Sequence, residues 1–425
     1  MSKPATNRGQ PGPDPLHFLV TKGLLRSRLA LRMARLVVRR QNGYRPHERV
    51  SLDFTLNLVE RLYADRSAPA VWINIFVPSE LIWGLKLVPF CPETAAAVGA
   101  GLGLSQVGME RSAALGYPVD LCSFHRSAAG LSAAHFYPRA DAYLATSNLC
   151  DVTGQMMANF AHQAGRPFVL LDVPQSQDKA AVDYLTAQLQ GLVHRWTKEL
   201  GVRFEPDRMR QVIRLSNQAR ALAVEVAALR EAQPAPLRGS EMLGQLGLLT
   251  SMFGRPAGVA YYRALRDYTQ ERIQRAEPEQ AIQKVRLYWM QLRPYFPAEL
   301  MPHLEDELGG VVAFDEMNTV WWDALDEENP LRSLARKMLA TPLNGPVERR
   351  VDSALRHIQR YRCAGAVHFS HWGCRQTAGA LHVVRQELRR KGVPLLILDG
   401  DCVDPTNLQL GPLRTRVDAF IEMLV

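Results

Sequence analysis

The chain has 425 residues, of which 47% are apolar and 22% charged. This composition is typical of a globular protein of two or three domains, and it excludes wholesale disorder, a collagen-like fibre and a disulfide-rich miniprotein. The formal charge is +9, from 51 basic and 42 acidic residues. Residues 1–50 hold eleven of the basic and two of the acidic residues, so the rest of the chain is neutral as a set. The basic charge is therefore local, and we expect no nucleic-acid partner.

The N-terminal region, residues 1–66, is expected to form a basic arm and helices. Its first dozen residues are rich in Pro and Gly and predict a loose arm, and the arginines that follow are spaced three or four apart, as in a helix packed against the body of the chain. No apolar run of about 18 residues is free of charge, which predicts no transmembrane segment, and no signal peptide is evident. The sequence therefore predicts a cytoplasmic protein with reduced cysteines.

Short apolar runs alternate with long amphipathic segments through the rest of the chain, a rhythm typical of α/β layers. In the first half the runs predict buried strands at 71–77, 85–90, 119–121, 142–146 and 167–173. In the second half they predict strands at 248–253, 310–314, 365–369 and 394–398.

The segment from 175 to 238 is charged and rich in Leu and Ala, which predicts two long helices. The economical architecture is α/β, with two Rossmann-like or flavodoxin-like parallel-sheet domains, a helical connection and a helical N-terminal extension, because parallel strands need helical crossovers. The expected boundaries are 67–200 for the first sheet domain, 201–247 for the connection and 248–425 for the second sheet domain.

Five of the six cysteines follow predicted strands, and the sixth precedes one. Carboxyl ends of parallel strands are where ligands bind in open α/β sheets. Converging thiolates suit an iron–sulfur cluster; a structural zinc is the competing metal, although its usual CxxC pairs are missing. Each cysteine is also explained as a small buried hydrophobe. The five are Cys91, Cys122, Cys150, Cys374 and Cys402, and the sixth is Cys363.

Several of these cysteines lie in longer motifs. The first half contains GYPVDLCS at 116–123, ATSNLCD at 145–151 and LDVP at 171–174. The second contains HWGCR at 371–375, VPLLILDGD at 393–401, RTR at 414–416 and FIE at 420–422. In combination these motifs resemble the 2-hydroxyacyl-CoA dehydratase and benzoyl-CoA reductase family over roughly residues 68–425.

The resemblance implies two α/β domains with an iron–sulfur cluster in the cleft between them, ligated at Cys122, Cys150 and Cys374. It also implies an ATP-hydrolysing activator protein that carries its own [4Fe–4S] cluster and delivers single electrons. Family members dehydrate a 2-hydroxyacyl-CoA or reduce the ring of benzoyl-CoA, and they form dimers of related chains. Homodimer and heterodimer both remain open for this chain.

Six cysteines exceed the three that a [4Fe–4S] cluster of this family needs. One branch of the family binds a double-cubane [8Fe–9S] cluster with three thiolates for each cubane, and Cys91, Cys363 and Cys402 complete that number. The count therefore favours a double-cubane reductase of small molecules over a [4Fe–4S] subunit of an acyl-CoA enzyme. A non-catalytic protein that stores or scaffolds clusters is the alternative of a different class.

Polar residues near these motifs are further candidates. Ser123, Ser147 and Asn148 either hydrogen-bond cluster sulfurs or cap helices. His125 and His371 either deliver protons or are structural, and Glu316 either relays protons or caps a helix. Arg375 either neutralises the cluster, clamps an anionic substrate or forms an ion pair. No GxxxxGK[ST] motif is present, so the sequence predicts no ATP site of its own.

Overall fold

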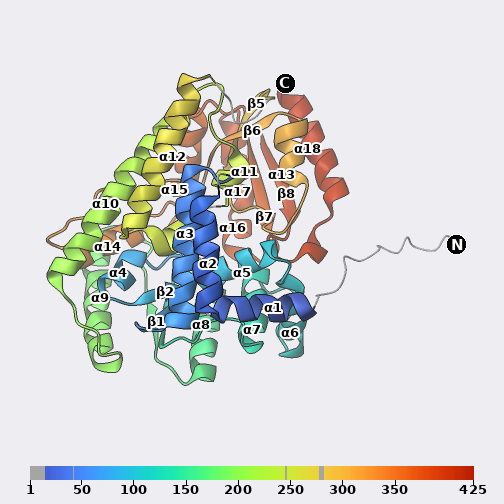
Figure 1. Ribbon diagram of the computed structural model, residues 1–425. Coiled ribbons are helices and arrows are strands. Elements are labelled where there is room, and N and C mark those ends of the chain that lie inside the picture. Colours follow the sequence, from blue (N-terminus) through green and yellow to red (C-terminus); the bar gives the residue numbers. More distant parts are fainter. Residues whose placement is uncertain (1–14, 42, 245–246, 277–281) are drawn as a thin grey trace.

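A computed structural model of the chain describes residues 15–41, 43–244, 247–276 and 282–425. The fold is mixed α/β, with two parallel four-stranded sheets among many helices (Figure 1). This confirms the predicted fold class. In the described residues no helix is long and apolar enough to cross a membrane.

The two sheets have the same topology. The first has the order β2-β1-β3-β4 and the second the order β6-β5-β7-β8, so in each the strand that comes first in sequence is central and the order reverses beside it. A reversal of this kind creates a crevice at the carboxyl ends of the two central strands. The first sheet comprises β1 Ala70–Ile73, β2 Val88–Phe90, β3 Ala142–Thr146 and β4 Phe168–Leu171; the second comprises β5 Val285–Met290, β6 Gly310–Asp315, β7 Gly365–His371 and β8 Leu395–Gly400.

Two of the predicted strands are wrong and one real strand was missed. Residues 119–121 form a turn, and Leu248–Met252 form a π-helical turn. Short apolar runs of this kind do not distinguish a strand from another buried segment. The missed strand is β5, at the centre of the second sheet. Its second residue is Arg286, whose guanidinium donates to the carbonyls of Tyr361, Ala232 and Arg230, so a charged residue interrupts an otherwise buried run.

The two long helices expected within 175–238 are present as α9 Lys179–Glu199 and α10 Pro206–Leu229. Helix α10 packs against α12 Pro256–Gln274, and α12 packs against α3 Pro46–Val59. Figure 1 shows α10 and α12 running side by side along one flank of the molecule. Several helices, α3 and α12 among them, have Pro at the first turn, where its missing N–H costs nothing.

The basic N-terminal region forms α1 Pro15–Arg26 and α2 Arg28–Arg40, and both lie against the body of the chain (Figure 1). The guanidinium of Arg35 lies 3.1 Å and that of Arg39 2.9 Å from the Asp53 carboxylate on α3. The loose arm expected for the first dozen residues lies outside the described residues.

The remaining helices cover the two sheets. One core packs around the first sheet, and a second core contains Phe124 of the first half together with Phe369 of the second, so the halves share buried contacts. Around the first sheet lie α4 Ser79–Gly84, α5 Pro92–Gly101, α6 Ser105–Ala114, α7 Ser123–Ala133 and α8 Asp151–Ala164; in the second half lie α11 Gly239–Met242, α13 Leu300–Pro302, α14 Pro330–Leu339, α15 Val347–Arg360, α16 Arg375–Gly379, α17 Leu381–Arg390 and α18 Leu410–Leu424.

Candidate iron–sulfur and acyl site

Three cysteines line one cavity between the two halves. Cys122, Cys150 and Cys374 are the N-cap residues of α7, α8 and α16, and each thus stands where a loop enters a helix. Their shared cavity has a volume of about 610 Å³. Two thiols come from the first half of the chain and one from the second, so only the folded chain brings them together.

The loops of Cys122 and Cys374 touch through a glycine. Gly373 has a φ of +78°, and a Cβ built there would lie 2.7 Å from the backbone nitrogen of Cys122 and 3.0 Å from the carbonyl oxygen of Asp120. A side chain at this position would therefore clash with rigid backbone. Gly373 sets the spacing of two thiols that belong to different halves of the molecule.

Replacing Gly373 with Ala is expected to destabilise the chain by about 2–5 kcal/mol, because a left-handed φ costs about 1–2 kcal/mol and overpacking about 1–3 kcal/mol. The clash should also separate Cys122 from Cys374 and lower the iron content of the purified chain. Gly379→Ala is the control, because a Cβ at Gly379 meets nothing within 4 Å and the residue has no positive φ. Equal thermal midpoints and iron contents for the two variants would contradict the role given to Gly373.

His371, the last residue of β7, contacts the first of these thiols. Its Nε2 lies 3.3 Å from Cys122 Sγ, and its Nδ1 accepts a hydrogen bond from the backbone N–H of Cys402 at 3.1 Å. An accepting Nδ1 leaves the proton of the neutral imidazole on Nε2, so Nε2–H points at the sulfur. Burial lowers the pKa of His371, although the Asp401 carboxylate opposes this. A neutral histidine therefore donates to Cys122.

The other two thiols have a threonine neighbour one helical turn later. Thr377 Oγ1 lies 3.2 Å from Cys374 Sγ, and the Thr153 side chain hydrogen-bonds Cys150. His125 Nε2 lies 3.2 Å from Thr153 Oγ1 and 3.7 Å from Cys150 Sγ. Burial lowers the pKa of His125 to about 4, so this imidazole is neutral at pH 7.

These threonines were not among the predicted site residues, but the sequence holds a signal for them. A cysteine followed three residues later by threonine occurs at 91–94, 150–153 and 374–377. In each case the cysteine is the N-cap of a helix, and the threonine is at the third helical position, which faces the cap. Asp401 was also missed: its carboxylate accepts from Ser123 Oγ at 2.5 Å and lies 3.8 Å from His371 Nδ1.

Thiolates are the ligands that iron–sulfur clusters take, so the three cysteines have the donor chemistry that such a cluster needs. Across the described residues, no three Cys, His, Asp or Glu side chains are close enough to hold one ion. Burial raises the pKa of Cys122 well above its ordinary value, and the Cys374 and Cys150 thiolates raise it further. Bound cationic iron would offset that penalty, since a coordinating thiol is deprotonated outright.

The remaining three cysteines do not line this cavity. Cys402 is fully buried in the shared core, where burial and the nearby Asp401 raise the pKa of its thiol well above its ordinary value. Cys91 is buried with its Sγ 3.2 Å from Glu93 Oε2. Cys363 precedes the amino end of β7, at the opposite end of that strand from Cys374, and packs in a separate core. The structure thus does not bring Cys363 to the site.

Three polar residues that the sequence analysis singled out, Ser147, Asn148 and Arg375, lie at different places around the site. Ser147 donates to the Asp172 carboxylate at 2.9 Å and accepts from the N–H of Val173, which joins the ends of β3 and β4. Asn148 is buried and lines the thiol cavity, and its Oδ1 has no hydrogen-bond partner among the described residues. Arg375 is exposed at the rim of the same cavity.

Glu316 lies at a second, smaller cavity, after the end of β6. Its carboxylate receives two bonds from Arg350, at 2.7 and 2.8 Å, and one from the backbone N–H of Gln291 at 3.0 Å. Burial raises the pKa of Glu316, but Arg350 more than offsets this and holds the pKa below its ordinary value. The arrangement is a neutralised buried ion pair, with no helix cap at this carboxylate.

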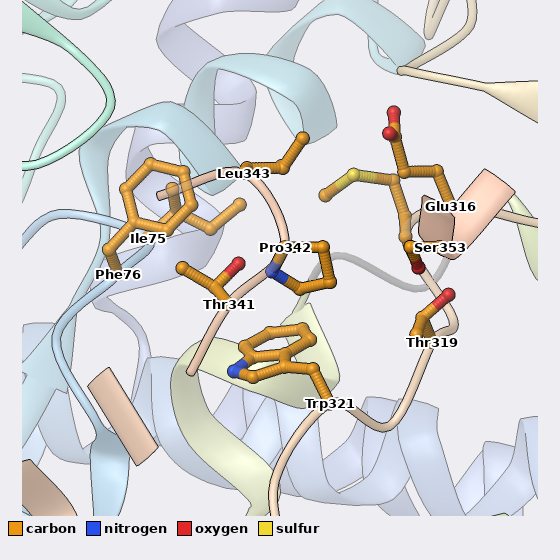
Figure 2. Close-up of a pocket in the computed structure, with 10 residues that line it drawn as sticks. Ile75, Phe76, Glu316, Thr319, Trp321, Thr341, Pro342, Leu343 and Ser353 are labelled. Atoms are coloured by element: carbon orange, nitrogen blue, oxygen red, sulfur yellow. The ribbon is translucent and has the colours of Figure 1, made fainter. Parts of the chain in front are cut away.

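The second cavity is mainly apolar and adjoins the thiol cavity. Its volume is only about 30 Å³, and Figure 2 shows Phe76, Trp321, Pro342 and Leu343 arranged around it. Leu343 lines both cavities, and a third cavity joins the two through Asn148 on one side and Trp321 on the other. An apolar compartment therefore lies beside the three thiols.

Comparison with known proteins gives consistent matches. The family model of the 2-hydroxyglutaryl-CoA dehydratase D-component matches residues 74–424. The chain is 21% identical over 377 residues to the (R)-phenyllactyl-CoA dehydratase alpha subunit of Clostridium sporogenes, covering 85% of this chain and 91% of that protein. It is 24% identical over 402 residues to a benzoyl-CoA reductase subunit of Thauera aromatica, covering 86% and 91%. It is also 20% identical over 376 residues to the (R)-2-hydroxyisocaproyl-CoA dehydratase alpha subunit of Clostridioides difficile, covering 85% and 91%.

Proposed function

Because the chain belongs to the family of the 2-hydroxyglutaryl-CoA dehydratase D-component, we propose that it is the iron–sulfur subunit of an enzyme that dehydrates or reduces an acyl-CoA. Relatives that cover most of its length are named as such dehydratases and reductases, so enzymatic activity is the supported class of function. The observation that carries the proposal is the cavity between the two halves, which is lined by three thiols and adjoins an apolar compartment.

The cofactor proposed is a [4Fe–4S] cluster held by Cys122, Cys150 and Cys374. The cysteine count alone favours an [8Fe–9S] double cubane, which needs six thiolates. The position of Cys363 at the far end of β7, in a separate core, supports the smaller cluster. When bound, the cluster would supply electrons at low potential.

The residues of this chain hold and tune that site. The Nε2–H of His371 donates to Cys122 Sγ, and Thr377 donates to Cys374 Sγ. Hydrogen bonds to ligand sulfur stabilise added negative charge and so raise the reduction potential. His125 and His371 are neutral at pH 7, since burial lowers the pKa of both.

The electron donor is proposed to be an ATP-hydrolysing activator protein, because the chain has no phosphate-binding motif of its own. Val119 and Trp372 support a docking site beside the ligands. They lie on the loops of Cys122 and Cys374, and their side chains are 70% and 53% exposed. We also propose a cytoplasmic location, where thiols remain reduced.

The acyl group is proposed to be apolar and uncharged. The compartment beside the thiols presents Phe76, Trp321 and Leu343, and its one carboxylate, Glu316, is neutralised by Arg350. An acyl group with a carboxylate of its own would bury a second negative charge there, and none of the residues that line the compartment supplies a free cation to pair with it. The relatives named for phenyllactyl, 2-hydroxyisocaproyl and benzoyl groups act on acyl chains of this kind.

Anaerobic purification and assay test these proposals. About four iron and four sulfide per chain are expected, and about eight iron would support the double cubane instead. With ATP, a reductant and an activator, turnover of phenyllactyl-CoA or 2-hydroxyisocaproyl-CoA should exceed that of 2-hydroxyglutaryl-CoA at least tenfold. A chain without iron would contradict the proposal, and a chain with iron but no turnover of any acyl-CoA would favour a cluster-storing scaffold.

A further inference from the structure

Three arginines from separate segments converge on Trp83 of α4. The guanidinium carbon of Arg255 lies 4.7 Å and that of Arg61 5.3 Å from the centre of the indole ring. Arg208 Nε donates to the Trp83 carbonyl at 3.1 Å. Arg61 belongs to the π-helical segment Glu60–Asp65, Arg208 to α10, and Arg255 is the N-cap of α12. We call these three residues the arginine cluster.

The arginine cluster has no carboxylate partner. Among the residues that the structure describes, none of its three guanidiniums forms an ion pair. Asp65 attracts the charge of Arg61, but the Asp65 carboxylate pairs with Arg28. The nearby Glu205 is likewise paired, with Lys86 at 2.5 Å. The cluster therefore carries positive charge that the neighbouring acids do not balance.

The three guanidiniums are close enough to repel one another, and all three arginines are partly buried. Burial lowers the pKa of Arg255, and the charges of Arg61 and Arg208 lower it further. Arg255 Nε is buried and has no hydrogen-bond partner in the described part of the chain. Like charges that are brought together away from water cost free energy unless an opposite charge joins them. The arrangement therefore has the features of an anion site.

A phosphate group suits the arginine cluster better than a chloride ion or a single carboxylate. Guanidinium groups match the oxygens of a phosphate, and two negative charges balance more of the cluster than one does. Helix α12, which is 19 residues long, begins at Arg255, so its amino end adds partial positive charge. We propose that Arg61, Arg208 and Arg255 bind the phosphate group of a ligand.

Two ligands share this chemistry, free phosphate and the 3′-phosphate of coenzyme A. The second rests on the proposed function, in which the substrate is an acyl-CoA, and the first does not. None of the three arginines is among the residues that line the thiol cavity, the apolar compartment or the cavity that joins them. Phosphate binding can therefore be measured separately from iron content and turnover.

Calorimetric titration of the anaerobically purified full chain with inorganic phosphate, in chloride buffer of constant ionic strength, tests the site. Arg255→Met and Arg61→Met should each weaken phosphate binding about tenfold or more, because each removes a charged donor. Phosphate should also raise the thermal midpoint of the wild type more than that of either variant. Arg255→Lys keeps the charge but loses the planar fork, so its affinity should be intermediate.

Arg263→Met is the matched control. Arg263 is an exposed residue of the same helix with no ion pair to a described residue, so this variant changes the net charge equally and should bind phosphate as the wild type does. Iron content should be unchanged in every variant, which distinguishes a failure of this site from a failure of the proposed function. A wild type that binds neither phosphate nor coenzyme A, full affinity in both Arg255→Met and Arg61→Met, or an equal loss in Arg263→Met would overturn the proposal.

Coenzyme A and 3′-dephospho-coenzyme A distinguish the two ligands. If the wild type binds coenzyme A about tenfold more tightly and Arg255→Met binds the two equally, the 3′-phosphate occupies the arginine cluster. If the wild type binds the two equally and also binds inorganic phosphate through the cluster, free phosphate is the ligand.

Discussion

Replacing Cys150 with Ser is expected to remove most of the iron from the anaerobically purified chain and to abolish turnover of acyl-CoA. Cys150 is one of the three thiols that line the cavity between the halves, and the other two cannot enclose a cluster alone. Serine keeps the size and the N-cap position of the side chain, so α8 should form as before. Iron and sulfide analysis, with circular dichroism to verify folding, measures the effect.

The other cysteines provide matched controls for this result. Cys363→Ser should leave iron and turnover unchanged, because Cys363 precedes the amino end of β7 and packs in a different core. Cys402→Ala should also retain iron, with a modest loss of stability from the small cavity that it leaves. Halving of the iron by either variant would return that cysteine to the ligand set and favour the double-cubane cluster. Unchanged iron in Cys150→Ser would refute the three-thiol site itself.

Replacing Arg350 with Met is expected to destabilise the chain by about 3–5 kcal/mol, because it leaves the Glu316 carboxylate buried without its partner. Arg350 is almost fully buried and makes both of its carboxylate bonds to Glu316. The variant also places an uncompensated negative charge on the apolar compartment and should weaken binding of apolar acyl groups. Urea unfolding of the wild type and the variant at pH 7 measures the stability change.

The pH dependence should identify the cause of that change. In the wild type the pKa of Glu316 is lowered, so the pair stabilises the fold above the ordinary pKa of about 4.3 and this contribution is lost as the pH falls below it. Without Arg350, burial raises the pKa instead, and stability should increase as the pH falls from 7 towards 5. The double variant Arg350→Met with Glu316→Gln should recover part of the loss. A wild-type-like pH profile in Arg350→Met would show that the ion pair is not the origin.

Local pattern predicted most of the fold. Seven strands, β1 to β4 and β6 to β8, and the two long helices after β4 were predicted, because buried parallel strands and amphipathic helices have different apolar periods. The central strand β5 was missed because Arg286 occurs in it, and the charge is stabilised only by carbonyls of distant segments. The turn at 119–121 was mistaken for a strand because a short apolar run carries no period.

The candidate site was predicted less completely. Cys122, Cys150 and Cys374 were named as ligands from motifs, and the structure places all three at one cavity. Cys363 was grouped with them because the total of six cysteines equals the number that a double-cubane cluster needs. That total carries no information about which end of a strand a residue occupies. The ion pair between Glu316 and Arg350 joins residues far apart in sequence, and no local sequence pattern predicts it.

The sequence by itself determined that the chain forms α/β layers, that its positive charge belongs to the first 50 residues, and that most of its cysteines, though not Cys122, lie near strand ends, because composition and periodicity are local properties. Only the tertiary structure decided which cysteines meet, that four of the N-terminal arginines pair with Asp53, Glu60 and Asp65, and that an apolar face of α2 remains uncovered among the described residues. These are contacts between segments distant in sequence, and they depend on how the helices and the two sheets pack.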